Sequence, residues 1–438
     1  MKQGTGKMNK KYKTCKKMTG FLSLFTAMLI FILCLFVKME ATAEEAAPPL
    51  DIIMNLSAEL YKGDKIKLDI KGMESAAVTA ESSNKKVATV DEKGKVSALK
   101  CGKTQINISL VYPNYTKRVI INLRVTRCSY RSKKKLLMYK GDKADISVSS
   151  TCPGAVVLVE SSDKKAANIK GGKLIAGAKG KTVLTASAET GGEKAEIALS
   201  LKVSEKPKLK VTDKMKDDWF KGSIMAGHSV GLGFQSYCRA QYNGFLGNAR
   251  HISVGCYGVY NDMAPISGSS LHPTINGRKA RLKDHVKALG AKKVFINYGL
   301  NDIGVFGPDR FIKSYESLVN ELVKQNKNTT AYIVSPTPMY RPNGSLNNAN
   351  MRIINKALAK YSKKTERVEF IDVFTPMLDG TGKLNGAYCS DGYCHITFAG
   401  YKVYSDALKE FAAKKIVEET DKKDKLYTKK ETAKTSGE

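Results

Sequence analysis

The sequence predicts a multidomain protein in which two small all-β sandwiches precede a larger α/β domain with a parallel sheet. Three observations support this fold class. The 438 residues are enough for two to four domains. Residues 44–206 contain an internal repeat of short segments that alternate apolar and polar residues. Beyond about Lys208, wholly apolar segments alternate with amphipathic helical ones. The composition, 42% apolar and 26% charged, excludes collagen-like, multi-span membrane and wholly disordered chains.

The first 43 residues have the organisation of a secretory signal. A basic start is followed by an apolar run over residues 21–37 and by the small-residue site Ala41-Thr42-Ala43, after which we expect cleavage. The alternative is an uncleaved membrane anchor, because a run of this length can just span a bilayer. Both interpretations place the rest of the chain outside the cytoplasm, secreted or at the cell surface.

The cysteine positions and the net charge indicate which metals and macromolecules the chain can bind. Seven cysteines follow residue 43, so at least one is free or paired between chains, and Cys389 and Cys394 are close enough in sequence to bridge. There is no CxxC pair or Cys/His cluster, so we expect no metal site. The net charge of +32 is spread along the chain, which argues against nucleic acid and favours weak attraction to an anionic cell envelope.

The repeat divides the β-rich part into residues 44–126 and 127–206. Tyr61-Lys62-Gly63-Asp64-Lys65 recurs as Tyr139-Lys140-Gly141-Asp142-Lys143. Short alternating segments separated by Gly, Asn, Asp and Ser turns are typical of a β-sandwich. The stretch over residues 82–90, with the Gly-Lys-Val-Ser-Ala turn at 94–98, resembles bacterial immunoglobulin-like domains of group 2. The resemblance implies a passive spacer or, alternatively, a module that binds polysaccharide or a host.

The domain over residues 207–417 is predicted to be α/β. Apolar strands are expected at five segments, 222–226, 251–255, 293–298, 330–334 and 368–373. Amphipathic segments at 311–325 and 350–360 separate some of them. This alternation indicates a parallel sheet covered on both faces. Ligands of such sheets lie at the carboxyl ends of the strands.

Residues that could take part in catalysis lie at or after the ends of these strands. Ser229 follows the first strand, Gly255 ends the second and Gly258 follows it, and Asn301 follows the third, while Asp391 and His395 lie near the end of the domain. A serine hydroxyl needs an imidazole to take its proton, and the imidazole needs a carboxylate to orient it. Backbone N–H groups and an Asn amide can then stabilise an oxyanion.

The segments that contain Ser229, Gly258, Asn301 and the pair Asp391 and His395 resemble those of the SGNH hydrolase (GDSL-type esterase/lipase) superfamily, and the resemblance covers about residues 215–415. The resemblance implies a three-layer α/β/α, flavodoxin-like fold, with Ser229 as nucleophile, His395 as base and Asp391 orienting it. It implies an oxyanion hole from Ser229, Gly258 (Gly255 is the alternative) and Asn301. Two departures stand out. His228 replaces the usual Asp, and competes with His395 as an alternative base. Three residues, rather than two, separate Asp391 from His395.

The predicted function is a secreted or surface serine esterase without metal or organic cofactor. The substrate class implied by the resemblance is an ester-bearing carbohydrate or cell-wall polymer, such as an acetylated polysaccharide or peptidoglycan. Two alternatives remain: an O-acyltransferase with the same site, and a non-catalytic adhesion protein with a degenerate SGNH domain. Tyr257, Tyr260, Tyr340 and Arg341 are candidates to line the pocket. His251, His272 and His285 are interpreted as structural or surface residues. Residues 418–438 are expected to form a disordered tail.

Overall fold

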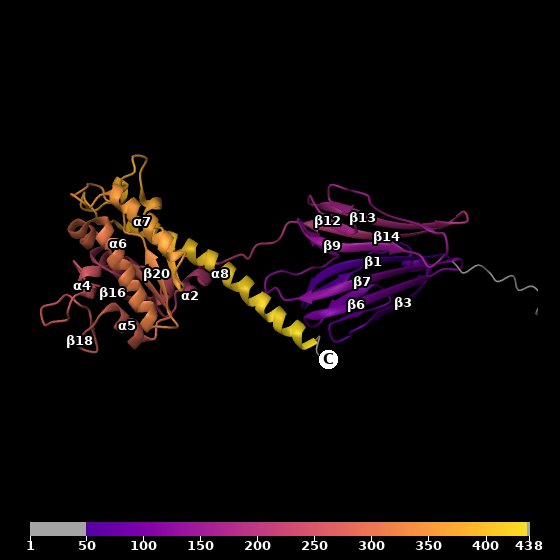
Figure 1. Cartoon of the computed structure of the whole chain (residues 1–438), viewed down its shortest axis with the longest axis horizontal. Helices are drawn as coiled ribbons and strands as arrows, with labels where there is room; N and C mark the ends of the chain where they lie inside the picture. The colour runs from indigo at the N-terminus through magenta and orange to yellow at the C-terminus, as the bar shows by residue number, and fades with distance from the viewer. Residues whose placement is uncertain (1–49, 436–438) are drawn as a thin grey trace, which may run out of the picture.

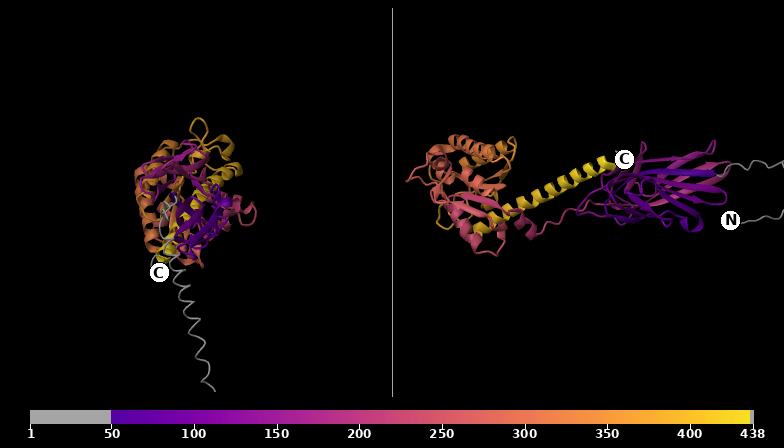
Figure 2. Two further views of the ribbon diagram at one scale, coloured as in Figure 1. Left: turned by 90° about the vertical axis from the view of Figure 1, so that its right-hand side faces the viewer. Right: turned by 90° about the horizontal axis from the view of Figure 1, so that it is seen from below.

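The computed structural model describes residues 50–435. Figure 1 shows a β-rich unit and an α/β unit at opposite ends of an elongated molecule, with one long helix running from the second to the first. The right-hand view in Figure 2 shows the same arrangement from below. Within the described range, no helix is both long enough and apolar enough to cross a membrane. The predicted signal or anchor at residues 1–43 lies outside the described residues.

The β-rich unit consists of two sets of seven strands, one for each sequence repeat. The first set is β1 (Leu50–Tyr61), β2 (Lys65–Lys67), β3 (Ala77–Ser82), β4 (Ala88–Val90), β5 (Lys95–Ala98), β6 (Gly102–Val111) and β7 (Tyr115–Thr126), with the short helix η1 (Met73–Ser75). The second set is β8 (Leu137–Tyr139), β9 (Lys143–Ser149), β10 (Val156–Ser161), β11 (Ala167–Lys170), β12 (Lys173–Ala176), β13 (Gly180–Thr190) and β14 (Glu193–Ser204).

The two sets repeat the same local structure. Strand β1 pairs parallel with β7, and β8 pairs parallel with β14. The hydroxyl groups of Ser82 and Thr104 lie 3.0 Å apart, and those of Ser161 and Thr182 lie 2.7 Å apart in the second set. Buried side chains alternate with more exposed ones along β6 and β13, as a strand with one face on a core requires. The predicted β-sandwich repeats are confirmed in this fold.

The two repeats are not separate domains that follow one another along the chain. Strand β9 pairs antiparallel with β1, from Ile53 opposite Ser149 to Leu56 opposite Ile146. This pairing joins strands of both repeats into one seven-stranded sheet with the order β11-β12-β9-β1-β7-β6-β3. Buried side chains of both repeats belong to one continuous hydrophobic cluster. The predicted boundary at residues 126/127 falls between β7 and β8, but the structure places the two repeats edge to edge.

The α/β unit follows the linker after β14. Its strands are β15 (Ser223–Gly227), β16 (Arg250–Ser253), β17 (Thr274–Ile275), β18 (Arg278–Lys279), β19 (Lys293–Asn297), β20 (Thr330–Val334) and β21 (Val368–Ile371). Its helices are α2 (Asp213–Trp219), α3 (Ser229–Arg239), η2 (Phe245–Asn248), α4 (Val259–Met263), α5 (Leu282–Leu289), α6 (Leu300–Gln325), α7 (Asn348–Ser362), η3 (Thr375–Met377), η4 (Gly386–Tyr388) and α8 (Phe398–Thr435).

The main sheet of this unit has five strands in the order β16-β15-β19-β20-β21. Every neighbouring pair is parallel, and all five residues of β15 are buried. Numbered along the chain, the order is 2-1-3-4-5, the flavodoxin-like doubly wound order. The predicted α/β fold class is confirmed. In this order the direction of chain progression reverses between β15 and β19, and the crevice there is where ligands bind in such sheets.

Helix α8 overturns the prediction of a disordered tail from residue 418, because it continues to Thr435. Its far end packs on the β-rich unit, where Asp424 and Thr428 are buried. Asp424 Oδ2 accepts hydrogen bonds from the Ser129 N–H (2.8 Å) and hydroxyl (3.0 Å). Thr428 Oγ1 accepts one from the Arg127 N–H at 2.7 Å. The composition of this segment gives no apolar stripe, so only tertiary partners reveal the ordered helix.

Candidate active site

Ser229 is the first residue of α3, directly after β15. The turn between them is tight: a side chain on Gly227 would come within 2.9 Å of the Gly231 backbone. His228 caps the helix, because its Nδ1 accepts a hydrogen bond from the Val230 N–H at 3.3 Å. The Ser229 hydroxyl therefore stands at the carboxyl edge of the sheet, beside the crevice that the strand order creates.

The imidazole of His395 reaches Ser229 from the other end of the domain. His395 Nε2 lies 3.0 Å from Ser229 Oγ, across 166 positions of sequence. On the opposite side of the ring, Nδ1 lies 2.6 Å from Asp391 Oδ2. The three predicted catalytic side chains thus form one continuous chain of hydrogen bonds.

The loop accommodates the extra residue between Asp391 and His395. Asp391 Oδ1 accepts hydrogen bonds from the N–H groups of Tyr393 (2.7 Å), Cys394 (2.9 Å) and His395 (3.2 Å). Gly392 takes the left-handed conformation that closes this turn, with φ +67°. Partial burial of the Asp391 carboxylate raises its pKa. The hydrogen bond with His395 and the three N–H donors outweigh this effect and hold the pKa of Asp391 at about 2. The carboxylate stays charged beside the imidazole.

Gly258 lies in the loop after β16, directly before α4, and Asn301 lies in the first turn of α6, after β19. Asn301 Nδ2 donates to the Tyr257 carbonyl at 2.8 Å, so it holds the loop that contains Gly258. A side chain on Gly258 would overlap the carboxylate of Asp302. The alternative, Gly255, has open space around the same position. Close approach therefore requires glycine at Gly258 and does not require it at Gly255.

Asp302 has a structural role that the sequence interpretation missed. Its carboxylate accepts hydrogen bonds from the N–H groups of Val259 (3.2 Å) and Tyr260 (3.0 Å), although the side chain is buried. Burial raises the pKa of Asp302, and the two N–H donors counteract part of that effect. The available signal for this residue was its position directly after Asn301, after the end of a predicted strand.

The competing base, His228, is oriented away from this role. It is buried, and its Nδ1 is engaged with the Val230 N–H, whereas the Ser229 hydroxyl contacts His395. Burial, together with the nearby His395, lowers the pKa of His228 to about 4. His228 is therefore neutral near pH 7 and serves as the cap of α3.

Two of the remaining histidines contact backbone carbonyl groups of the same unit. His272 Nε2 lies 3.3 Å from the Asp262 carbonyl, and His285 Nε2 lies 3.2 Å from the Pro273 carbonyl. Burial lowers the pKa of His251 to about 4. These contacts agree with a structural role.

Of the predicted pocket residues, Tyr260 lines a cavity and Tyr257 does not. Tyr257 is buried and its hydroxyl donates to Asp262 at 2.9 Å. Tyr260 is 58% exposed and packs against Phe306, with ring centres 5.2 Å apart. Both rings, with Asp302 and Arg310, line a cavity of about 230 Å³. Tyr340 is half-buried and Arg341 is exposed.

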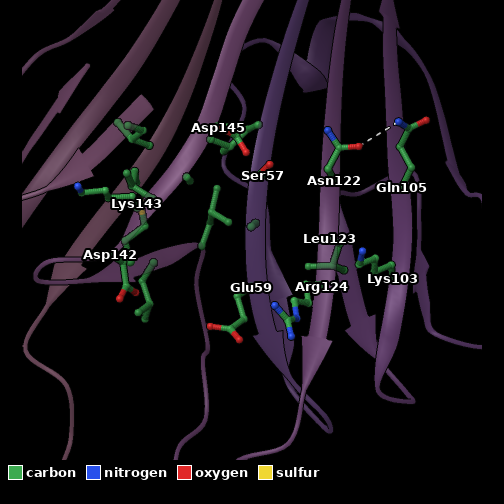
Figure 3. A pocket seen from close by; sticks show the side chains of 18 of the residues that line it. Ser57, Glu59, Lys103, Gln105, Asn122, Leu123, Arg124, Asp142, Lys143 and Asp145 are labelled. Atoms are coloured by element: carbon green, nitrogen blue, oxygen red, sulfur yellow. Dashed lines mark hydrogen bonds between the residues drawn. The ribbon is translucent and has the colours of Figure 1, made fainter. Parts of the chain in front are cut away.

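A larger cavity, of about 790 Å³, lies in the β-rich unit where the two repeats meet. Figure 3 shows that its wall carries both signs of charge, including Glu59, Arg124 and Asp142, and a hydrogen bond between Gln105 and Asn122. Its lining contains no histidine or cysteine. The volume of a cavity therefore does not identify the chemical site in this chain.

Family comparisons agree with both units. The GDSL-like lipase/acylhydrolase family matches residues 222–403, and the bacterial Ig-like domain (group 2) matches residues 67–109, within the first repeat. No curated protein matches the chain.

Solved structures similar to this chain include a GDSL-like lipase from Bacteroides thetaiotaomicron, 18% identical over 45% of this chain and 90% of that one (TM-score 0.34). A carbohydrate esterase family 3 protein from Talaromyces cellulolyticus is 13% identical over 46% and 98% (TM-score 0.32). A carbohydrate esterase family 2 enzyme with a carbohydrate binding domain from Corynascus thermopiles is 14% identical over 56% and 78% (TM-score 0.33).

The match to the GDSL-like lipase/acylhydrolase family identifies the α/β unit as that of a carboxylic ester hydrolase. More particularly, the chain contains a GDSL-like lipase/acylhydrolase domain at residues 222–403, preceded by a group 2 bacterial Ig-like domain at residues 67–109. Both predicted resemblances are confirmed.

Proposed function

We propose that the chain is an exported serine esterase that removes small acyl groups, acetyl above all, from a carbohydrate or cell-wall polymer. The observation that carries the proposal is the hydrogen-bond chain Ser229–His395–Asp391, with separations of 3.0 and 2.6 Å. Export rests on the basic and apolar residues before Ala43. The polymer substrate rests on the family resemblance and on the carbohydrate esterases among the similar structures.

In the first half of the reaction, Ser229 Oγ attacks the ester carbonyl while its proton passes to His395 Nε2. The charged Asp391 stabilises the resulting imidazolium and keeps the proton of Nδ1 on the side away from Ser229. The carbonyl oxygen becomes an oxyanion. His395 then protonates the departing alcohol, the C–O bond to the alcohol breaks, and an acyl-Ser229 ester remains.

The oxyanion would be stabilised by the N–H groups of Ser229 and Gly258 and by the amide of Asn301. Ser229 begins α3, so its N–H has no partner within the helix. An Asn amide has two N–H bonds, and one of Asn301 donates to Tyr257, which leaves the other for the substrate. Asp302 holds the Gly258 loop in place from behind.

In the second half, water replaces the alcohol. His395 Nε2 takes a proton from the water, hydroxide oxygen bonds to the acyl carbon, and the Ser229 ester breaks to release the carboxylic acid. Ser229 Oγ recovers its proton from His395. An acceptor sugar in place of water would make the same acyl-enzyme a transferase.

A fluorophosphonate probe tests the proposed nucleophile. We expect one covalent label, mapped to the peptide that contains Ser229; a label on another residue contradicts the assignment. Release of acetate from an acetylated polysaccharide without an added acceptor supports hydrolysis over transfer. Folded wild-type protein that hydrolyses neither acetyl nor butyryl esters would favour the non-catalytic adhesion alternative.

A further inference from the structure

The loop before α8 carries more than the proposed base and its carboxylate. Cys389 and Ile396 form an isolated antiparallel bridge, and the Ser390 N–H donates to the His395 carbonyl at 2.9 Å. This closes a narrow hairpin between them. Cys389, Asp391, Cys394 and His395 all lie in that hairpin. Four metal-ligating side chains therefore share one short, closed segment.

Their donor atoms converge. Asp391, Cys394 and His395 each offer one ligand atom, and these atoms lie within 4.8 Å of one another. It is the one group of three such residues within the described range, 50–435. Cys389 supplies a fourth donor, because its Sγ lies 3.6 Å from Asp391 Oδ1. Both thiols are free.

We propose that this hairpin binds a zinc ion through Asp391, Cys394, His395 and Cys389. Zinc is four-coordinate with thiolate, imidazole and carboxylate ligands at about 2.0–2.3 Å, which places neighbouring donors roughly 3.5 Å apart. The donors of Asp391, Cys394 and His395, which lie within 4.8 Å of one another, would need to move by about 1 Å to reach that spacing. The sequence predicted no metal site because it lacks a CxxC pair, but the hairpin brings together donors that no such spacing announces.

Zinc at this position would switch off the proposed esterase, so the consequence, though not the binding, rests on the proposed function. The nitrogen beside Asp391 is Nδ1, while Nε2 faces Ser229. When zinc takes the place of the proton on Nδ1, the ring takes up a proton from water at Nε2 and so stays neutral, while each of the two thiols releases its proton to water. A neutral imidazole bound to metal through Nδ1 carries its proton on Nε2, where it cannot accept the Ser229 proton.

Binding is tested first without catalysis. In full-length Ser229→Ala, kept reduced, we expect zinc chloride to bind at one site by isothermal titration with release of protons to the buffer. Cys394→Ser should weaken the binding by roughly 100-fold, since one of four ligands is lost. Cys389→Ser, at a less buried position, should weaken it in the same direction and serves if Cys394→Ser does not fold. Cys256→Ser is the matched control, because Cys256 is an exposed thiol of the same unit.

Inhibition is then measured in the chain that retains Ser229. Zinc should lower kcat for a short-chain nitrophenyl ester and magnesium should not, while Cys394→Ser and Cys389→Ser remain active at zinc concentrations that silence wild type and Cys256→Ser. Equal inhibition of all four proteins overturns the inference, as does absence of zinc binding in Ser229→Ala. A mass showing Cys389 and Cys394 joined in the isolated protein also overturns it. Zinc binding by a chain without esterase activity would overturn only the proposed function.

Discussion

The β-rich unit and the α/β unit both contain hydrogen-bonded polar side chains, but they use them differently. In the β-rich unit the same hydroxyl pair occurs twice, Ser82 with Thr104 and Ser161 with Thr182, each pairing neighbouring segments of its own repeat. In the α/β unit, Ser229 and His395 come from opposite ends of the domain to one sheet edge. A polar contact that recurs with the repeat indicates structure, whereas a contact that brings a serine hydroxyl and an imidazole together at the ligand-binding edge of the sheet indicates chemistry.

The largest expected effect tests this contrast directly. Ser229→Ala should reduce ester hydrolysis by roughly 10⁴-fold or more, because the nucleophile is lost. Thr182→Val, which removes the repeated hydroxyl contact, should leave kcat/KM near wild type and lower only stability. Initial rates with a nitrophenyl acetate and denaturant unfolding of both variants decide the matter. A large loss of rate in Thr182→Val would break the contrast.

The two loop glycines give the next effect. Gly258→Ala should lower kcat by roughly 10²-fold, because the added methyl overlaps the Asp302 carboxylate and displaces a proposed oxyanion donor. Gly255→Ala is the matched control, since the added methyl meets open space there. The measurement is kcat and KM separately. If Gly255→Ala is the more damaging change, Gly255 rather than Gly258 is the oxyanion residue.

A third substitution tests the contact between α8 and the β-rich unit without touching the proposed catalytic residues. Asp424→Ala removes the acceptor of two Ser129 hydrogen bonds and should destabilise the contact between α8 and the β-rich unit by about 1–3 kcal/mol, with hydrolysis unchanged. Hydrogen exchange at the Ser129 amide should report it. Asp406→Ala on the same helix is the control, because its pair with Lys402 is exposed and contributes about 0–1 kcal/mol. Unchanged exchange at Ser129 in Asp424→Ala would contradict the packing.

The last effect is confined to acidic pH, and it belongs to the α/β unit, which contains all five histidines. The pKa of His228 is about 4 in the fold against about 6.5 when unfolded. Between these values only the unfolded chain binds the proton, so stability falls as pH falls from about 6.5 to about 4. His228→Asn, which keeps an acceptor for the Val230 N–H, should flatten that slope in unfolding measurements across this range. An unchanged slope would show that His228 does not titrate in this way.

The sequence predicted the fold class and the three side chains that meet, because both follow from local patterns. Apolar strands that alternate with helices define a parallel sheet, and residues after such strands share one edge. The role of Asp302 was missed because its partners, the N–H groups of Val259 and Tyr260, lie 43 and 42 positions away. No periodicity encodes a contact between the first turns of two helices that are distant in sequence.

The ordered end of α8 and the joining of the repeats were missed for a related reason. Residues after Glu418 have no apolar face that would predict a helix, and Asp424 and Thr428 become informative only beside Arg127 and Ser129. The repeat predicts each sandwich, but two exposed edges carry no sequence signal for pairing with each other. The β1–β9 pairing therefore depends on backbone groups that every residue possesses.

Helix α8 also sets the mechanics of the whole molecule. Its 38 residues, at about 1.5 Å each, make a stiff arm of about 57 Å, anchored in the core of the α/β unit at one end and clamped to the β-rich unit at the other. A flexible linker alone would let the hydrolase sweep a volume around its support. Because α8 contacts both units, whatever holds the β-rich unit also sets the distance and the orientation of Ser229 relative to that support.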